Sequence, residues 1–163
     1  MSTASPRGDP PRESVRTKLT RWGFNMIPAY WGSGARLTFV ADDYREVHLK
    51  LPLTWRTRNY VGTIFGGSIY AAVDPVYMVM LIKNLGPDYV VWDKAASIRF
   101  RKPGRTALYA QFTLSEEQIE HIRREVAANG RVDSVYHVAL MDRAGTVHAD
   151  VEKTIHVRRR EAP

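Results

Sequence analysis

The apolar segment Ile64–Leu85, which reads IFGGSIYAAVDPVYMVMLIKNL, decides the fold of this protein. It approaches the roughly 20 apolar residues that a membrane span requires, but Asp74, Pro75 and Lys83 interrupt it. A helix that is apolar nearly all round must be surrounded by other elements rather than laid on one surface. We therefore expect no membrane span but one long buried helix, which begins at Gly66 and is kinked where Pro75 lacks an N–H.

Runs of alternating apolar and polar residues predict β-strands on both sides of this helix. In the first run, Leu37, Phe39 and Ala41 are expected to share one face. The expected strands are 36–41, 46–51, 89–102, 108–112, 135–141 and 147–157. One long apolar helix among antiparallel strands is an α+β layout, in which the sheet is expected to curl around the helix.

Two further helices are expected, each with a recognisable N-cap. The segment 14–26 has Ser14 as its N-cap and places four apolar residues on one face: Val15, Leu19, Trp22 and Met26. The segment 115–128 begins with a capping box of Ser115 and Gln118. Each of these helices therefore carries an apolar stripe.

The length of 163 residues fits one domain. We expect a disordered leader at 1–13, where prolines occur among polar residues without periodicity. A folded domain at 14–157 and a basic tail at 158–163 follow. The first residues lack the apolar centre of a secretory signal, so the protein is expected to stay in the cytoplasm.

The composition excludes several kinds of chemistry. With no cysteine, the chain has no disulfide, no thiolate zinc site and no cysteine nucleophile. Its five histidines show no metal-binding spacing, so no metal is expected. The net charge of +7 suits an anionic partner. That partner is not expected to be nucleic acid, because the basic termini lack interleaved aromatic residues or a reader motif.

The run 59–74, NYVGTIFGGSIYAAVD, resembles a motif of acyl-CoA thioesterases of the hotdog fold, particularly the phenylacetyl-CoA thioesterase-like group. Those proteins carry an Asn, a spaced Gly, usually His-Gly-Gly, and an Asp one helical stretch later. The matching residues of this sequence are Asn59, Gly62, Gly66, Gly67 and Asp74. The runs 92–94 and 98–103 are similar to a less characterised branch of the same superfamily. The resemblance covers about 36–157 and implies the hotdog fold, a curled antiparallel sheet wrapped around one central helix.

The physical chemistry of this motif fits thioester hydrolysis. Gly66 and Gly67 leave backbone N–H groups without intrahelical partners, and these groups and the helix dipole would stabilise the oxyanion of a tetrahedral intermediate. The resemblance implies that Asp74 acts as general base on water or as nucleophile. Asn59 orients a water or only its own loop. The structural alternative is a glycine-rich helix start without a ligand and a carboxylate satisfied in a subunit interface.

Other residues are expected to contact the substrate. Phe65 stands where many relatives have His, and its ring cannot donate a hydrogen bond to the oxyanion. Asp93, with Lys94, aligns near a position where some relatives carry a Ser or Thr that holds the catalytic water, although the pair is equally explained as a solvated charge pair. Arg99 and Arg101 suit the phosphates of coenzyme A, or simply keep the surface basic.

The resemblance therefore implies an enzyme that hydrolyses an acyl-CoA or related thioester, with no cofactor beyond the coenzyme A of its substrate. It also implies a homodimer or a dimer of dimers, which would complete the site and cover exposed sheet edges. The alternative is a non-catalytic hotdog module that binds an acyl thioester as a sensor or scaffold. The aromatic Phe65 and the unusual Pro75 keep this alternative open.

Overall fold

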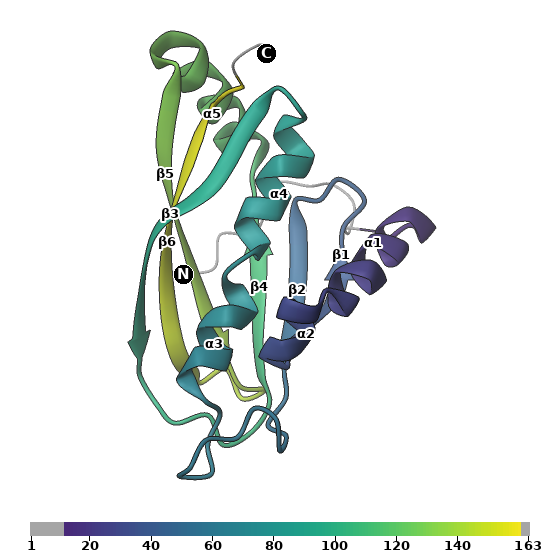
Figure 1. Cartoon of the computed structure of the whole chain (residues 1–163), viewed down its shortest axis with the longest axis vertical. Coiled ribbons are helices and arrows are strands. Elements are labelled where there is room, and N and C mark those ends of the chain that lie inside the picture. The colour runs from purple at the N-terminus through teal and green to yellow at the C-terminus, as the bar shows by residue number, and fades with distance from the viewer. Residues whose placement is uncertain (1–11, 161–163) are drawn as a thin grey trace.

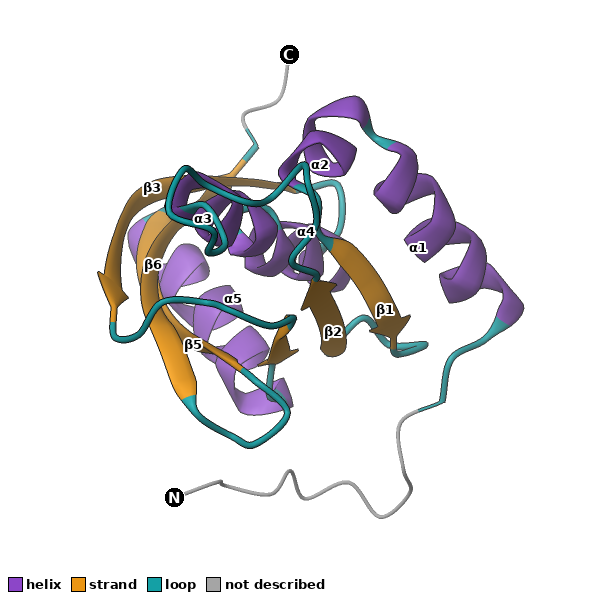
Figure 2. Ribbon diagram, turned by 90° about the horizontal axis from the view of Figure 1, so that it is seen from below, coloured by secondary structure: helices purple, strands orange, loops and turns teal. Residues whose placement is uncertain are grey.

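Six antiparallel strands form one curled sheet in the computed structural model, which describes residues 12–160. The strands are β1 (Arg36–Val40), β2 (Glu46–Leu51), β3 (Tyr89–Phe100), β4 (Leu108–Thr113), β5 (Arg131–Met141) and β6 (Val147–Arg159). They lie in the order β1-β2-β4-β5-β6-β3. The sheet curls around the helices at its centre (Figures 1 and 2), which confirms the α+β layout expected from the sequence.

The central helix is divided into two helices at Asp74 and Pro75, where a single kinked helix was expected. Helix α3 covers Gly66–Val73 and helix α4 covers Val76–Leu85. The break follows from Pro75, which has no N–H to donate within a helix. Pro75 instead becomes the N-cap of α4, and its carbonyl accepts a hydrogen bond from Val79 N at 3.0 Å. Asp74 is thereby placed at the break, midway along the buried axis of the molecule.

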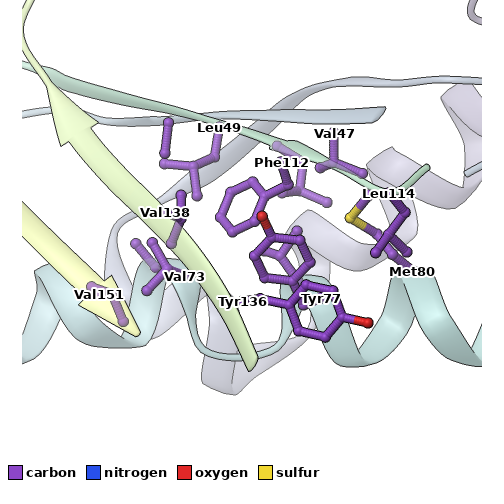
Figure 3. Close-up of a cluster of buried hydrophobic side chains, with 14 of the residues drawn as sticks. Val47, Leu49, Val73, Tyr77, Met80, Phe112, Leu114, Tyr136, Val138 and Val151 are labelled. Atoms are coloured by element: carbon purple, nitrogen blue, oxygen red, sulfur yellow. The ribbon is translucent and has the colours of Figure 1, made fainter. Parts of the chain in front are cut away.

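The core lies between these two helices and the concave face of the sheet. The ring of Tyr77 from α4 stacks on Tyr136 of β5 with 4.6 Å between centroids, and meets Phe112 of β4 edge-on at 5.1 Å. Figure 3 shows this aromatic group among the aliphatic side chains that surround it. The segment predicted to be buried all round is buried along its inner side, with Ala72, Val73 and Leu81 fully enclosed, whereas Ile82 and Lys83 are exposed.

Three more helices lie at the sides of the sheet: α1 (Val15–Met26), α2 (Pro28–Ser33) and α5 (Glu116–Asn129). Helix α5 has the predicted capping box and buries its apolar stripe, Ile119, Ile122 and Val126. Helix α1 also has its predicted N-cap, Ser14. It packs outside β1 (Figure 2), but it buries Thr17 and leaves its apolar stripe in solvent.

The boundaries and register differ in places from those expected. A bulge between Leu37 and Phe39 breaks the alternation of β1, so Val40 is buried beside Leu37 while Phe39 is only half-buried. Strand β6 continues through Arg159, inside the segment expected as a tail. The expected leader ends earlier than residue 13, because Glu13 pairs with Arg21 at 2.7 Å. The rest of the leader and tail, 1–11 and 161–163, lies outside the described residues.

Within residues 12–160, each helix is too short or too polar to cross a membrane.

Candidate active site

A buried lysine, Lys153, lies between two aspartates at the break of the central helix. It occupies an inward-facing position of β6, between the buried Val151 and Ile155, and its side chain has no exposed surface. Its ammonium Nζ lies 2.6 Å from Asp74 Oδ1 and 2.9 Å from Asp93 Oδ1. A charge can be buried at this position because it is paired on two sides.

The three charged groups set one another's protonation. Burial alone would lower the pKa of the Lys153 ammonium, but the hydrogen bonds and charges of Asp74 and Asp93 outweigh it and raise that pKa above the usual value. Burial raises the pKa of the Asp93 carboxyl, and Lys153 opposes this rise. Burial and a hydrogen bond with Asp74 also raise the pKa of Tyr70, whose hydroxyl lies 3.4 Å from Lys153 Nζ. Lys153 is therefore a cation at neutral pH.

Asp74 is the accessible end of this network. Its side chain is 42% exposed, against 22% for Asp93 and none for Lys153. A ligand or a water molecule therefore reaches Asp74 before the other two groups. The ion pair with Lys153 fixes the direction of the carboxylate, which is the positioning that a general base needs.

The start of helix α3 presents the second expected feature, a set of backbone amides at Gly66 and Gly67. Phe65 is the N-cap and offers no side-chain hydrogen bond to these amides, so they face outward as unpaired helix-start donors. The rings of Phe65 and Phe100 lie against the two glycines. A Cβ on Gly67 would come within 2.3 Å of the Phe65 ring, and a Cβ on Gly66 within 3.0 Å of the Phe100 ring.

Asn59 organises the loop that leads into α3. Its Oδ1 accepts hydrogen bonds from the backbone N–H groups of Val61 and Thr63 at 3.1 and 2.9 Å. Its Nδ2 donates to Thr63 Oγ1 at 2.9 Å. Of the two roles considered from the sequence, the orientation of the loop is the one these contacts describe.

The structure does not bring the expected base and the expected oxyanion donors together within one chain. Gly67 and Asp74 are seven residues apart along a helix that rises 1.5 Å per residue, so about 10 Å separates them. As a nucleophile, Asp74 would have to lie about 3 Å from a carbonyl that the amides hold, whereas a base that acts through a water molecule can lie farther away. Direct attack by Asp74 on a carbonyl held at the Gly66 and Gly67 amides of the same chain is therefore out of reach.

Asp93 and Lys94 do not form a pair. A bulge between Asp93 and Ala95 turns Asp93 toward Lys153, whereas Lys94 Nζ contacts Asp133 Oδ2 at 2.5 Å. The alternative of a charge pair between Asp93 and Lys94 is therefore wrong, because their side chains have different partners. The contact of these residues with a substrate stays a prediction.

Arg99 and Arg101 lie on the opposite face of β3 from the aspartate network. Ala96 pairs with Lys153 across the strands, and Arg99 pairs with Asp150 on the other face. Arg101 Nε contacts Asp150 Oδ2 at 2.7 Å. Within one chain neither guanidinium reaches Asp74, so any contact with the substrate has to run along the exposed edge of β3.

In the described part of the chain, His, Asp and Glu form no group of three or more that could hold a metal ion.

Lys153 is the central residue that reasoning from the sequence missed. In β6 the inward positions are Val147, Ala149, Val151, Lys153, Ile155 and Val157. A lysine in that apolar series was a visible signal, since a lysine is almost never fully buried unless it is paired.

A curled antiparallel sheet around a central helix is the hotdog fold, and solved structures confirm this class. A protein of unknown function from Pseudomonas aeruginosa, described as a probable thioesterase, is similar with a TM-score of 0.78 and 20% identity, over 88% of this chain and 96% of that chain. A thioesterase from Haemophilus influenzae matches with a TM-score of 0.67 and 12% identity, over 91% and 94%. The PaaI protein of the phenylacetic acid degradation operon of E. coli matches with a TM-score of 0.60 and 11% identity, over 89% and 93%.

Residues 16–157 match the family described as a domain of unknown function, DUF4442, and the chain belongs to this family. None of the curated proteins matches the sequence significantly.

Proposed function

We propose that this protein hydrolyses an acyl thioester, with coenzyme A as the carrier. The observation that carries the proposal is Asp74, an accessible carboxylate at the break of the central helix, oriented by the buried Lys153 at 2.6 Å. The unpaired amides at the start of α3 supply the matching oxyanion donors. Three solved structures with the same fold include two that are named thioesterases, which supports the same reaction class.

In the proposed reaction Asp74 takes a proton from a water molecule, and the water oxygen attacks the thioester carbonyl carbon. The carbonyl oxygen becomes an oxyanion and accepts hydrogen bonds from the amides at Gly66 and Gly67. The C–S bond then breaks. The sulfur leaves with the electron pair and takes the proton that Asp74 received from the water, which gives a free thiol and a carboxylic acid and restores the Asp74 carboxylate. Lys153 stays protonated and keeps Asp74 in a single orientation.

The working unit of this proposal is a homodimer. Since Gly67 and Asp74 of one chain are about 10 Å apart, the amides of one copy act with the carboxylate of the other. The edge strand β3 offers the contact, because among residues 12–160 no strand pairs with its outer side and it carries three small exposed residues, Ala95, Ala96 and Ser97. The exposed Arg99 and Arg101 on the same strand suit the phosphates of coenzyme A.

The test is thioester cleavage across a panel of acyl-CoA substrates, followed as release of free thiol. We expect turnover by the wild type and a loss of kcat of about a thousandfold or more in Asp74→Asn. Asp88→Asn, which removes an exposed carboxylate in the turn between α4 and β3, is the matched control and should keep full activity. Wild-type activity in Asp74→Asn would contradict the assignment of the base.

A non-catalytic module that binds acyl-CoA is the second candidate, and one observation favours it. Lys153 Nζ lies 2.6 Å from Asp74 Oδ1, so this oxygen is already engaged by the ammonium and is less free to bind a water molecule. This candidate predicts acyl-CoA binding by calorimetry without thiol release from any substrate of the panel. The two functions are therefore separated by one pair of measurements on the same protein.

A further inference from the structure

The outward face of helix α1 is apolar along its whole length. Val15, Leu19, Trp22 and Met26 follow one another at helical spacing and are between 58% and 74% exposed. The opposite face of the helix holds Thr17 and Phe24 against the body of the protein. The helix is therefore amphipathic in the reverse of the usual sense, with its most apolar side in solvent.

This stripe continues into a groove that contains three tryptophans. Trp22 and Met26 of α1, Trp31 of α2 and Trp55 of the following loop line the same groove. Trp31 and Trp55 are themselves exposed. We call the seven residues that make up this surface the α1 face: Val15, Leu19, Trp22, Met26, Ile27, Trp31 and Trp55. A contiguous exposed apolar surface of this kind marks an interaction site.

The charged residues that flank the α1 face are mainly basic, although Arg21 is paired with Glu13, which precedes the helix. Helix α1 contains Arg16, Lys18 and Arg21 and no acidic residue, and Lys18 and Arg16 lie on the two flanks of the stripe by helical spacing. The groove is lined by two further cations, Arg36 and Arg56. The guanidinium of Arg56 lies 3.7 Å from the centre of the Trp31 ring.

This charge pattern selects the kind of partner. A twofold contact between two copies would place the cations of one α1 face against the same, mainly basic, face of the other copy, and the like charges would repel in the partly dehydrated contact. An anionic surface meets the cations favourably and receives the apolar stripe at the same time. Tryptophan at the level of the lipid headgroups, with lysine and arginine beside it, is the arrangement typical of helices that lie in a membrane interface.

We propose that the α1 face docks on an anionic lipid surface. Helix α1 then lies parallel to the membrane plane, with Leu19 and Trp22 at the depth of the acyl-chain boundary and Lys18 and Arg16 among the headgroups. The sheet and the Asp74 network stay on the aqueous side, because α1 packs outside β1 (Figure 2).

The experiment is co-sedimentation of the full chain with vesicles of phosphatidylcholine alone or with added phosphatidylglycerol. We expect binding to the vesicles that contain phosphatidylglycerol, weakening with salt, together with a blue shift of tryptophan fluorescence. The double variant Leu19→Ser/Trp22→Ser should lose about tenfold or more in affinity. Its matched control, Val135→Ser/Met141→Ser, changes two exposed apolar residues of β5 and should bind as the wild type does.

The electrostatic part is tested by Lys18→Glu against Arg124→Glu, which makes the same charge change on the exposed side of α5. We expect only Lys18→Glu to weaken binding. Because the changed side chains are exposed, each variant should fold as the wild type does, and circular dichroism checks this. Equal loss in test and control variants would overturn the proposal, as would the absence of binding at low salt. Sedimentation velocity tests the alternative that the α1 face contacts a second copy of the chain. If the wild type is an oligomer and Leu19→Ser/Trp22→Ser dissociates it, the α1 face belongs to that contact and lipid docking is overturned.

Discussion

Lys153 holds two carboxylates that would otherwise repel each other. Without its ammonium, Asp74 and Asp93 would face each other across a space from which solvent is partly excluded. Two carboxylates that share a site cannot both ionise easily. The lysine therefore does two things at once: it allows both acids to be buried to the extent that they are, and it gives Asp74 a fixed direction.

The first prediction concerns Lys153→Met, which keeps the length of the side chain and removes its charge. We expect the free energy of unfolding at neutral pH to fall by about 3 kcal/mol, because two partly buried carboxylates lose their cation. The pH below which kcat declines should move to a higher value, since one carboxylate of the pair stays protonated to a higher pH without the lysine. Urea unfolding and the pH dependence of kcat measure these two effects.

The matched control for this variant is the double substitution Lys153→Met/Asp93→Asn, which removes one of the two negative charges as well. It should recover most of the lost stability. If Lys153→Met alone unfolds and titrates as the wild type does, the ion-pair network has no role in either property.

The second prediction concerns the close contact at the start of α3. In Gly67→Ala the new Cβ would lie 2.3 Å from the Phe65 ring, so the ring or the helix start has to move. We expect thioester cleavage to fall by about a hundredfold, because oxyanion donors lose their effect when displaced by about 1 Å. Gly23→Ala in α1 is the control, since no atom lies within 4 Å of its new Cβ. Activity retained in Gly67→Ala would remove these amides from the mechanism.

At the level of single residues, the sequence proposed Asp74 and the glycine pair as site residues, and reasoning from it did not find Lys153, which contacts Asp74. The position of Asp74 on a helix does not show which residue of a strand lies opposite it. That position depends on the register of β6 against β3, in which Lys153 stands beside Ala96. The alternation of β6 predicts from the sequence that Lys153 faces inward. The order of the strands in the sheet is needed to show that it then faces Asp74 and Asp93.

At the level of elements, the sequence predicted what local chemistry determines. The N-cap of α1, the capping box of α5 and the alternation of β2 are all present. The bulge in β1 was not predicted, because it depends on how β1 pairs with β2. The sequence also did not show that the apolar stripe of α1 faces solvent. Periodicity shows that a helix has an apolar face, but tertiary packing decides whether this face contacts the core or the solvent.

The third prediction belongs to the packing of α4 against β4 and β5. Burial raises the pKa of Tyr77 and of Tyr136 to about 12. The folded-state values lie above the value of about 10 in an unfolded chain. Their stabilisation is therefore complete below pH 10 and is lost as the pH rises through 12, by about 2–3 kcal/mol for each tyrosine.

Urea unfolding at pH 8, 10 and 11.5 measures this loss. In Tyr136→Phe the ring stays in the stack and the ionisable hydroxyl is removed, so the decline in unfolding free energy should be smaller. Tyr30 and Lys153, whose pKa values are also raised, account for part of the remaining decline. A decline of the same size in Tyr136→Phe would exclude this tyrosine as its cause.

At the level of the whole molecule, one chain holds both halves of the proposed chemistry but too far apart to act together. A long unpaired edge strand is a liability unless something covers it. Strand β3 has 12 residues, is the outermost strand next to β6, and is largely exposed. Pairing of β3 with β3 of a second copy would cover this edge and bring the two halves of the site together in one step.

The last prediction tests this link between assembly and activity. Ser97 lies in the exposed part of β3 beside Arg99. In Ser97→Lys, a twofold contact along β3 would bring the new cations and the two Arg99 side chains close together, and their repulsion should dissociate the dimer. We expect sedimentation velocity to show a monomer that is still folded, and thioester cleavage to be lost with the dimer. Ala144→Lys, on the exposed β5–β6 turn, should leave both unchanged. A monomeric Ser97→Lys protein with full activity would show that one chain suffices, and the amides of α3 would then have to be replaced as oxyanion donors by groups nearer to Asp74.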